Sequence, residues 1–122
     1  NNIALGKEIP IEELLDRARD INFYDFIASK EDGLDFIINE NGKNLSTGQR
    51  KKILLLRALF ADTELVILDE VLSGMDLESR NKVEMLIDDD MHKTYIIISH
   101  EPINNIHFTK KFKIKNGELS LL

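Results

Sequence analysis

Leu65-Val66-Ile67-Leu68-Asp69-Glu70 is a continuous apolar run that ends in two carboxylates. A second apolar run follows at residues 95–98, and a helical pattern from about Leu77 to Asp89 separates the two. Continuous apolar runs that alternate with helices are typical of a parallel sheet buried on both faces. The two runs therefore predict a βαβ unit and an α/β fold.

The segment before the first run has the pattern of a capped helix. Ser46 is followed three residues later by Gln49, which together form a capping box, and apolar residues then recur at helical spacing from Ile53 to Leu59. We predict a helix whose amino end lies at Ser46. On the simplest interpretation the motif only starts this helix.

The first turn of this predicted helix carries three cations, Arg50, Lys51 and Lys52, at the positive end of the helix dipole. Free backbone N–H groups, the Ser46 hydroxyl and Gly48 could bind a phosphate there, which would compensate the positive charge. The alternative is a solvated face with long side chains lying on apolar neighbours.

The flanking regions give weaker patterns. Residues 11–20 predict a helix with Glu12 and Glu13 in its first turn, and Asn22 is a candidate cap for a second short helix through about Lys30. Residues 31–45 predict a loop with one short extended piece at 36–38. At the end of the chain, two short strands around Asn116-Gly117 predict a hairpin.

Composition limits the class of protein. The chain has 122 residues, of which 43% are hydrophobic, enough for one domain with a core. Its net charge of −6 disfavours a nucleic-acid partner. It has no cysteine and no apolar run of membrane-spanning length. Because it starts at Asn1 without a methionine, we expect a piece of a longer polypeptide.

Polar residues follow both predicted strands, and ligands of open parallel sheets gather at this edge. Asp69 could hold Mg²⁺ together with water and phosphate oxygens, and Glu70 could act as a general base. His100 should arrive at the same edge and could donate a hydrogen bond to a phosphate or to water. The alternatives are that Asp69 caps a turn, Glu70 is solvated and His100 is an ordinary surface residue.

Residues 73–76, Ser-Gly-Met-Asp, lie between Glu70 and the next helix. Asp76 is at a plausible cap position. A loop that follows the two carboxylates directly could also communicate their state to a partner.

The order and spacing of these motifs resemble the ABC-type ATPases, the nucleotide-binding domains of ABC transporters. The corresponding motifs are the signature sequence at Leu45-Ser46-Thr47-Gly48-Gln49, the Walker B strand at Leu65–Asp69, the catalytic glutamate at Glu70, the D-loop at 73–76 and the switch histidine at His100. Residues 2–6 resemble the stretch after the glutamine loop of exporters, and residues 11–44 resemble the helical subdomain.

The resemblance implies an incomplete RecA-like P-loop NTPase core at residues 46–122, preceded by a helical subdomain portion at 1–45. It implies ATP and Mg²⁺ as cofactors and a head-to-tail dimer with a second nucleotide-binding domain. The nucleotide of that partner would be contacted by Ser46, Thr47, Gly48 and Gln49. This domain's own nucleotide would be acted on by Asp69, Glu70 and His100. Asp76 would communicate across the dimer. The resemblance further implies transmembrane domains as partners and a location at the cytoplasmic face of the membrane.

Two departures from the family pattern stand out. Thr47 replaces a glycine, which adds a β-branched side chain near the expected γ-phosphate. No Gly-x-x-x-x-Gly-Lys-Ser/Thr phosphate loop occurs in the 122 residues, and Gly42-Lys43-Asn44 does not supply one. We therefore expect the carboxyl-terminal half of an exporter ATPase domain, inactive as an isolated chain. A non-transport ABC-type ATPase of DNA repair or translation, and a non-catalytic interaction module, are the competing hypotheses.

Overall fold

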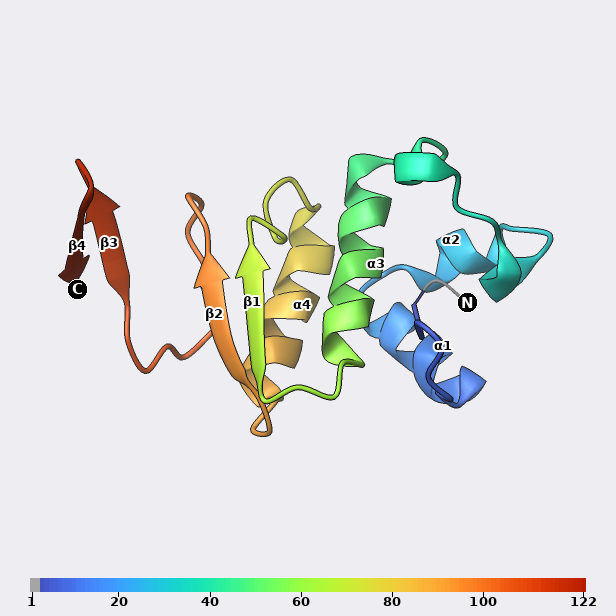
Figure 1. Cartoon of the computed structure of the whole chain (residues 1–122), viewed down its shortest axis with the longest axis horizontal. Helices are drawn as coiled ribbons and strands as arrows, with labels where there is room; N and C mark the ends of the chain where they lie inside the picture. The colour runs from blue at the N-terminus through green and yellow to red at the C-terminus, as the bar shows by residue number, and fades with distance from the viewer. Residues whose placement is uncertain (1–2) are drawn as a thin grey trace.

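The two apolar runs form neighbouring parallel strands. In the computed structural model, which describes residues 3–122, β1 (Leu65–Asp69) pairs with β2 (Thr94–Ile98) and helix α4 (Leu77–Asp89) connects them. Because Leu65 lies opposite Thr94 and Asp69 opposite Ile98, the carboxyl ends of both strands meet at one edge of the sheet (Figure 1). The predicted βαβ unit and α/β fold are confirmed.

The remaining elements lie on either side of this unit (Figure 1). They are helices α1 (Ile11–Asp20), α2 (Tyr24–Ala28) and α3 (Thr47–Leu59), the short 3₁₀ turns η1 (Gly33–Asp35) and η2 (Glu40–Gly42), and strands β3 (Phe112–Lys115) and β4 (Glu118–Leu121). Strands β3 and β4 form the predicted antiparallel hairpin around Asn116-Gly117. It stands apart from the helices at one end of the molecule, and its strand residues are all exposed.

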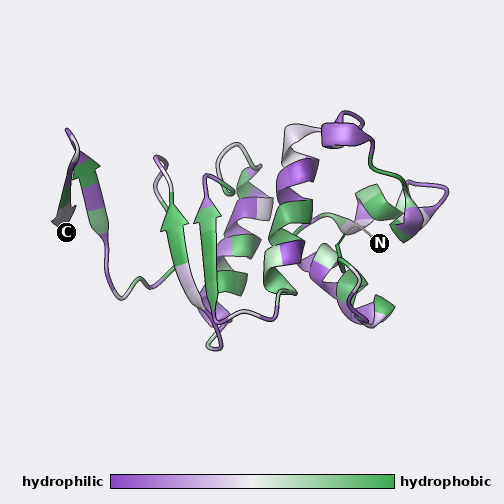
Figure 2. Cartoon of the chain, in the orientation of Figure 1, coloured by the Kyte–Doolittle hydropathy of each residue, from purple (hydrophilic) through white to green (hydrophobic). Residues whose placement is uncertain are grey.

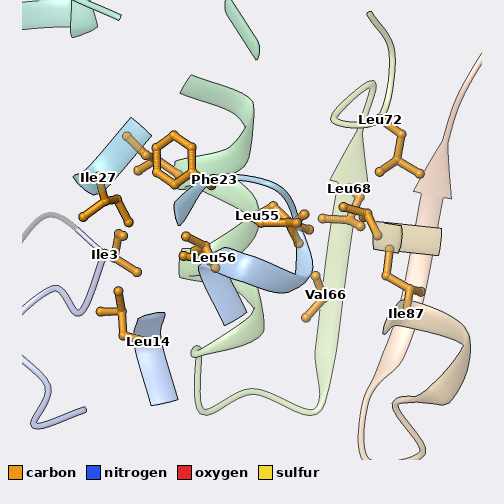
Figure 3. Packing of buried hydrophobic residues seen from close by; sticks show 14 of the residues in the cluster. Ile3, Leu14, Phe23, Ile27, Leu55, Leu56, Val66, Leu68, Leu72 and Ile87 are labelled. Carbon is orange, nitrogen blue, oxygen red and sulfur yellow. The ribbon is translucent and has the colours of Figure 1, made fainter. Parts of the chain in front are cut away.

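One face of the parallel sheet packs into the core and the other does not. Val66 and Leu68 are buried beside Leu55 and Leu56 of α3 and Ile87 of α4 (Figure 3). The alternate side chains point away from this core, and Ile67 and Ile96 are 60% and 48% exposed. The expectation of a sheet buried on both faces is therefore wrong for the described residues, because helices α3 and α4 pack on the Val66 side.

The amino-terminal helices contribute to the same hydrophobic core. Helix α1 spans the residues predicted for it, and its Leu14 and Ala18 join the cluster that contains Leu55. Figure 2 shows apolar residues along β1 and in β2, and bands of apolar and polar residues on the helices. The core therefore draws on both predicted segments, 1–45 and 46–122. Asn1 and Asn2, which belong to the first of these, lie outside the described residues.

One local prediction in this region is wrong. Asn22 does not cap α2: Phe23 is at the cap position without a side-chain hydrogen bond, and Asn22 has a left-handed φ of 53°. Its side-chain oxygen instead accepts a hydrogen bond from Lys82 Nζ at 2.8 Å. Residues 36–38 lie in a loop, as predicted, and no described segment pairs with them. The side chains of Phe36 and Ile38 pack against the core instead.

Candidate functional site

The capping box at the start of α3 is formed. Ser46 Oγ accepts a hydrogen bond from the backbone N–H of Gln49 at 3.1 Å, and Gln49 Oε1 accepts one from the backbone N–H of Ser46 at 2.8 Å. Two donors at the end of the helix are thereby satisfied reciprocally. The pair fixes the conformation of the residues between them, including Gly48.

We expect Ser46→Ala to lower the free energy of unfolding by about 1 kcal/mol, because the hydroxyl that accepts from Gln49 N–H is lost. Chemical denaturation of the variant beside the parent chain measures the loss. Ser120→Ala, at an exposed position of the hairpin, is the matched control and should change little. A Ser46→Ala variant as stable as the control would contradict the capping role.

Gly48 lies at a position where the fold does not require glycine. A Cβ atom built there would have Ser46 Oγ, 4.0 Å away, as its only neighbour within contact distance, and the residue is helical. Gly42, in contrast, has a φ of 64° and would bring a Cβ within 2.9 Å of Arg50 Cδ. Glycine at position 48 is therefore not explained by packing within the described chain.

A cavity of about 380 Å³ lies beside this helix start. Its walls come from the α3 amino end, from the loop before α4, and from α2 and the segment before it. The lining residues are Asn22, Phe23, Phe26, Ser46, Gly48, Gln49, Lys52, Gly74, Met75 and Asp76. The cavity thus brings the predicted signature residues and the predicted D-loop together.

The three cations of the first turn contact oxygen atoms of the chain itself. Lys51 Nζ donates to the backbone carbonyls of Glu70, at 2.8 Å, and of Ser73. Lys52 Nζ donates to Asn22 O and to Ser79 Oγ. These partners already compensate the two half-buried lysines, so neither requires a bound phosphate and neither is the solvated side chain of the alternative interpretation.

Glu70 and His100 meet at the carboxyl edge of the sheet. His100 Nδ1 lies 2.8 Å from Glu70 Oε1, and the backbone N–H of His100 donates to the same oxygen at 3.1 Å. The hydrogen bond to His100 lowers the pKa of the Glu70 carboxyl, and the same contact raises the pKa of the His100 imidazole. Because a carboxylate only accepts, Nδ1 carries the proton in this pair.

Glu70 has two further features that are unusual for a surface carboxylate. Its backbone is left-handed, with a φ of 51°, a conformation that costs free energy for a residue other than glycine. Among residues 3–122, its Oε2 is a buried side-chain oxygen without a hydrogen-bond partner. The strained residue therefore holds one carboxylate oxygen against His100, while the other is buried without a hydrogen-bond partner among the described residues.

Asp69 directly precedes Glu70 in the chain, and Asp76 directly precedes α4. Asp69, the last residue of β1, is exposed, and the described residues contain no group of three or more His, Cys, Asp or Glu side chains that could hold a metal ion. Asp76 caps α4, since its Oδ1 accepts from the backbone N–H of Ser79 at 2.8 Å. The hydrogen bonds from Ser79 lower the pKa of Asp76. The predicted cap at Asp76 is confirmed.

Comparison with known protein families gives a direct match. A family model described as ABC transporter matches residues 7–73, more than half of the chain, including the signature sequence, β1 and Glu70. The chain belongs to the ABC transporter family. The match carries no information on His100, which lies beyond its last residue.

Individual members of the ABC transporter family are also similar. The chain is 41% identical over 101 residues to an ATP-dependent lipid A-core flippase of Chromobacterium violaceum, covering 81% of this chain and 17% of the flippase. It is 34% identical over 122 residues to the flippase of Pasteurella multocida, covering 98% of this chain and 21% of the flippase. The chain therefore spans about a fifth of the length of these relatives or less.

A solved structure agrees with the fold. The structure of a bacterial Atm1-family ABC exporter with ATP bound matches with a TM-score of 0.70 at 27% identity, over 81% of this chain and 18% of the exporter chain. The parallel pair β1–β2 with its helices fits a partial RecA-like core. None of the described helices is long and apolar enough to cross a membrane.

Several residues that organise the site have no distinctive sequence motif. In the sequence Lys51 is one of three cations in a first helical turn, and no motif marks Arg80, Glu84 or Glu101. Arg80 and Glu84 have the i, i+4 spacing of a helical ion pair, which is a usable pattern. Their contacts with Glu101 and its neighbours depend on the tertiary fold, so local spacing could not reveal them.

Proposed function

We propose that this chain is part of the ATP-binding and ATP-hydrolysing domain of an ABC exporter. The observation that carries the proposal is the meeting of Glu70 and His100 at the carboxyl edge of the parallel sheet, next to Asp69. This is the edge where ligands of open α/β sheets bind. The family match and the similarity to ATP-dependent flippases and to an ATP-bound exporter support the same assignment.

In this proposal Glu70 is the general base and His100 orients it. The Glu70 carboxylate accepts a proton from the attacking water, while the two hydrogen bonds from His100 hold its Oε1. The lowered pKa of Glu70 keeps the carboxylate ionised at neutral pH, so it is ready to accept the proton. The raised pKa of His100 favours the imidazolium, which can also donate to a phosphate oxygen.

Asp69 is the proposed Mg²⁺ ligand. A single exposed carboxylate fits this ion, which commonly retains several water molecules and binds one or two carboxylates together with phosphate oxygens. When bound, Mg²⁺ would neutralise charge on the phosphates of ATP.

The amino end of α3 is proposed to bind the nucleotide of a second domain. Ser46, Thr47, Gly48 and Gln49 line or border the cavity beside the helix start and would contact phosphate there. Asp76, which also lines the cavity, would communicate between the two sites. The partners would be a second nucleotide-binding domain in a head-to-tail dimer and the transmembrane domains, at the cytoplasmic face of the membrane. Residues 1–45 would belong to the helical subdomain and 46–122 to the ATPase core.

Gly48→Val tests the split site without disturbing the fold. A polypeptide that joins this chain to a phosphate-binding loop, in a Glu70→Gln background that retains ATP, should dimerise when ATP is added. We expect Gly48→Val to abolish this dimerisation, because its side chain would occupy the space that a phosphate approaches closely. Light scattering with and without ATP measures it.

The control for this experiment is the stability of Gly48→Val alone. A side chain at position 48 meets no close neighbour within the described chain, so the unfolding midpoint should change little. Unimpaired ATP-dependent dimerisation by a folded Gly48→Val variant would contradict the proposed role of the helix start. Absence of dimerisation by the Glu70→Gln parent would contradict the ATPase assignment as a whole.

A further inference from the structure

The loop that follows His100 is attached to helix α4 through Arg80. The three guanidinium nitrogens of Arg80 each reach a different acceptor: Nε donates to Glu84 Oε1 at 2.9 Å, Nη1 donates to Glu101 Oε2, and Nη2 donates to the carbonyl of Pro102. The Arg80 side chain is only 13% exposed. One side chain therefore ties α4 to both the side chain and the backbone of the loop.

Glu84 fixes the other end of the same loop. Its side chain is 1% exposed, and its Oε2 accepts hydrogen bonds from the backbone N–H groups of Asn104, at 3.1 Å, and Asn105, at 2.9 Å. Burial alone would raise the pKa of this carboxyl, but the hydrogen bonds from Asn105 and Arg80 hold it below its usual value. A buried ion pair is costly to desolvate and is weak evidence for stability by itself, so its geometric effect on the loop is the more informative property.

Glu101 connects this attachment to the proposed catalytic residues. It directly follows His100, accepts from Arg80 through Oε2, and accepts from Ser73 Oγ through Oε1 at 3.3 Å. Ser73 lies in the loop that begins at Glu70, and its carbonyl also accepts from Lys51. The segments that carry Glu70 and His100 are thus joined at Glu101, and Arg80 holds Glu101 on α4.

We propose that Arg80 is a positioning residue which, with Glu84, holds the 100–105 loop on α4 so that His100 stays in contact with Glu70. The consequence for hydrolysis rests on the function proposed above. The contact between His100 and Glu70 can be measured in this chain without nucleotide. The positioning role of Arg80 and the proposed ATPase function can therefore be contradicted independently of each other.

Arginine is required for this role because of its shape as well as its charge. The guanidinium presents donors in several fixed directions, whereas a lysine ammonium is a point charge on a flexible stem. Arg80→Lys therefore retains the positive charge beside Glu84 and Glu101 but does not reproduce all three contacts. Arg80→Gln removes the charge as well.

The titration of His100, followed by NMR of its imidazole, distinguishes positioning from charge. The groups that face His100 are Glu70 and Glu101, which raise its pKa, and Lys51, which lowers it. If Arg80 positions the loop, both variants should weaken the contact with Glu70, and the titration midpoint of His100 should fall towards the ordinary value of about 6.5. If Arg80 acts only as a nearby positive charge, Arg80→Lys leaves the midpoint unchanged and Arg80→Gln raises it.

An unchanged His100 midpoint in Arg80→Lys together with a raised midpoint in Arg80→Gln would overturn the proposal. Arg17→Lys, at an exposed ion pair on α1, is the matched conservative control and should leave the His100 titration unaltered. Should Arg80→Gln fail to fold, judged by circular dichroism, Arg80→Lys alone decides.

In the polypeptide completed with a phosphate-binding loop, Arg80→Lys should lower kcat by roughly tenfold or more with little change in KM, because only the geometry of the reacting groups is altered. Unchanged kcat would also count against the proposal, whereas a parent without any turnover would overturn only the proposed function.

Discussion

Replacing Glu70 with glutamine is expected to reduce ATP turnover by about 10²- to 10⁴-fold, the range over which general-base catalysis contributes. The amide has nearly the same shape as the carboxylate, and its oxygen can still accept the hydrogen bonds from His100. It cannot accept a proton from water at neutral pH. The variant should therefore bind ATP and fail in the chemical step.

The measurement is steady-state phosphate release by the polypeptide that joins this chain to a phosphate-binding loop. Glu78→Gln is the matched control, since it makes the same chemical change on an exposed side chain of α4 that pairs only with neighbouring surface groups. We expect Glu78→Gln to retain the turnover of the parent. A Glu70→Gln variant whose ATP turnover is within about tenfold of that of the parent would contradict the assignment of Glu70 as the base. So small a loss of turnover is below the usual contribution of a general base.

The regular elements and their edges could be predicted from the sequence because local rules agree with the tertiary fold there. Helix α4 begins at the cap Asp76, and α3 begins at the capping box of Ser46. The pairing of β1 with β2 followed from their apolar runs, and it brought His100 to Glu70 as the topology requires. The catalytic roles of these residues stay predictions until turnover is measured.

The remaining features depend on contacts between distant segments. Asn22 has the residue type of a cap, but its side chain binds Lys82 and its carbonyl binds Lys52, so the tertiary contacts override the local preference. The exposed face of the sheet did not follow from the sequence, because the continuous apolar runs have the pattern of a sheet covered on both faces, whereas the described helices cover only the Val66 side. Likewise, the carbonyls that accept from Lys51 lie 19 and 22 residues away along the chain, and the Glu101 carboxylate that accepts from Arg80 lies 21 residues away, so local spacing does not reveal them.

Leu55→Ala is expected to lower the free energy of unfolding by about 2–5 kcal/mol, because the side chain is 0% exposed and its removal leaves a cavity in the core. Helix α3 depends on this contact: Leu55 packs in the cluster that also contains Val66 and Leu68 of β1 (Figure 3). A loss of this size is a large part of the total stability of an ordinary domain, about 5–15 kcal/mol.

The neighbouring residue gives the control for this prediction. Leu54 lies on the same helix, is 51% exposed, and changes by the same chemical step, so Leu54→Ala should alter stability by less than about 1 kcal/mol. Denaturant unfolding followed by circular dichroism measures both variants. Equal losses at the two positions would contradict the orientation of α3. Since the same helix begins at the proposed phosphate-binding residues and carries Lys51 to the carbonyl of Glu70, that orientation also determines how the two halves of the proposed site are arranged.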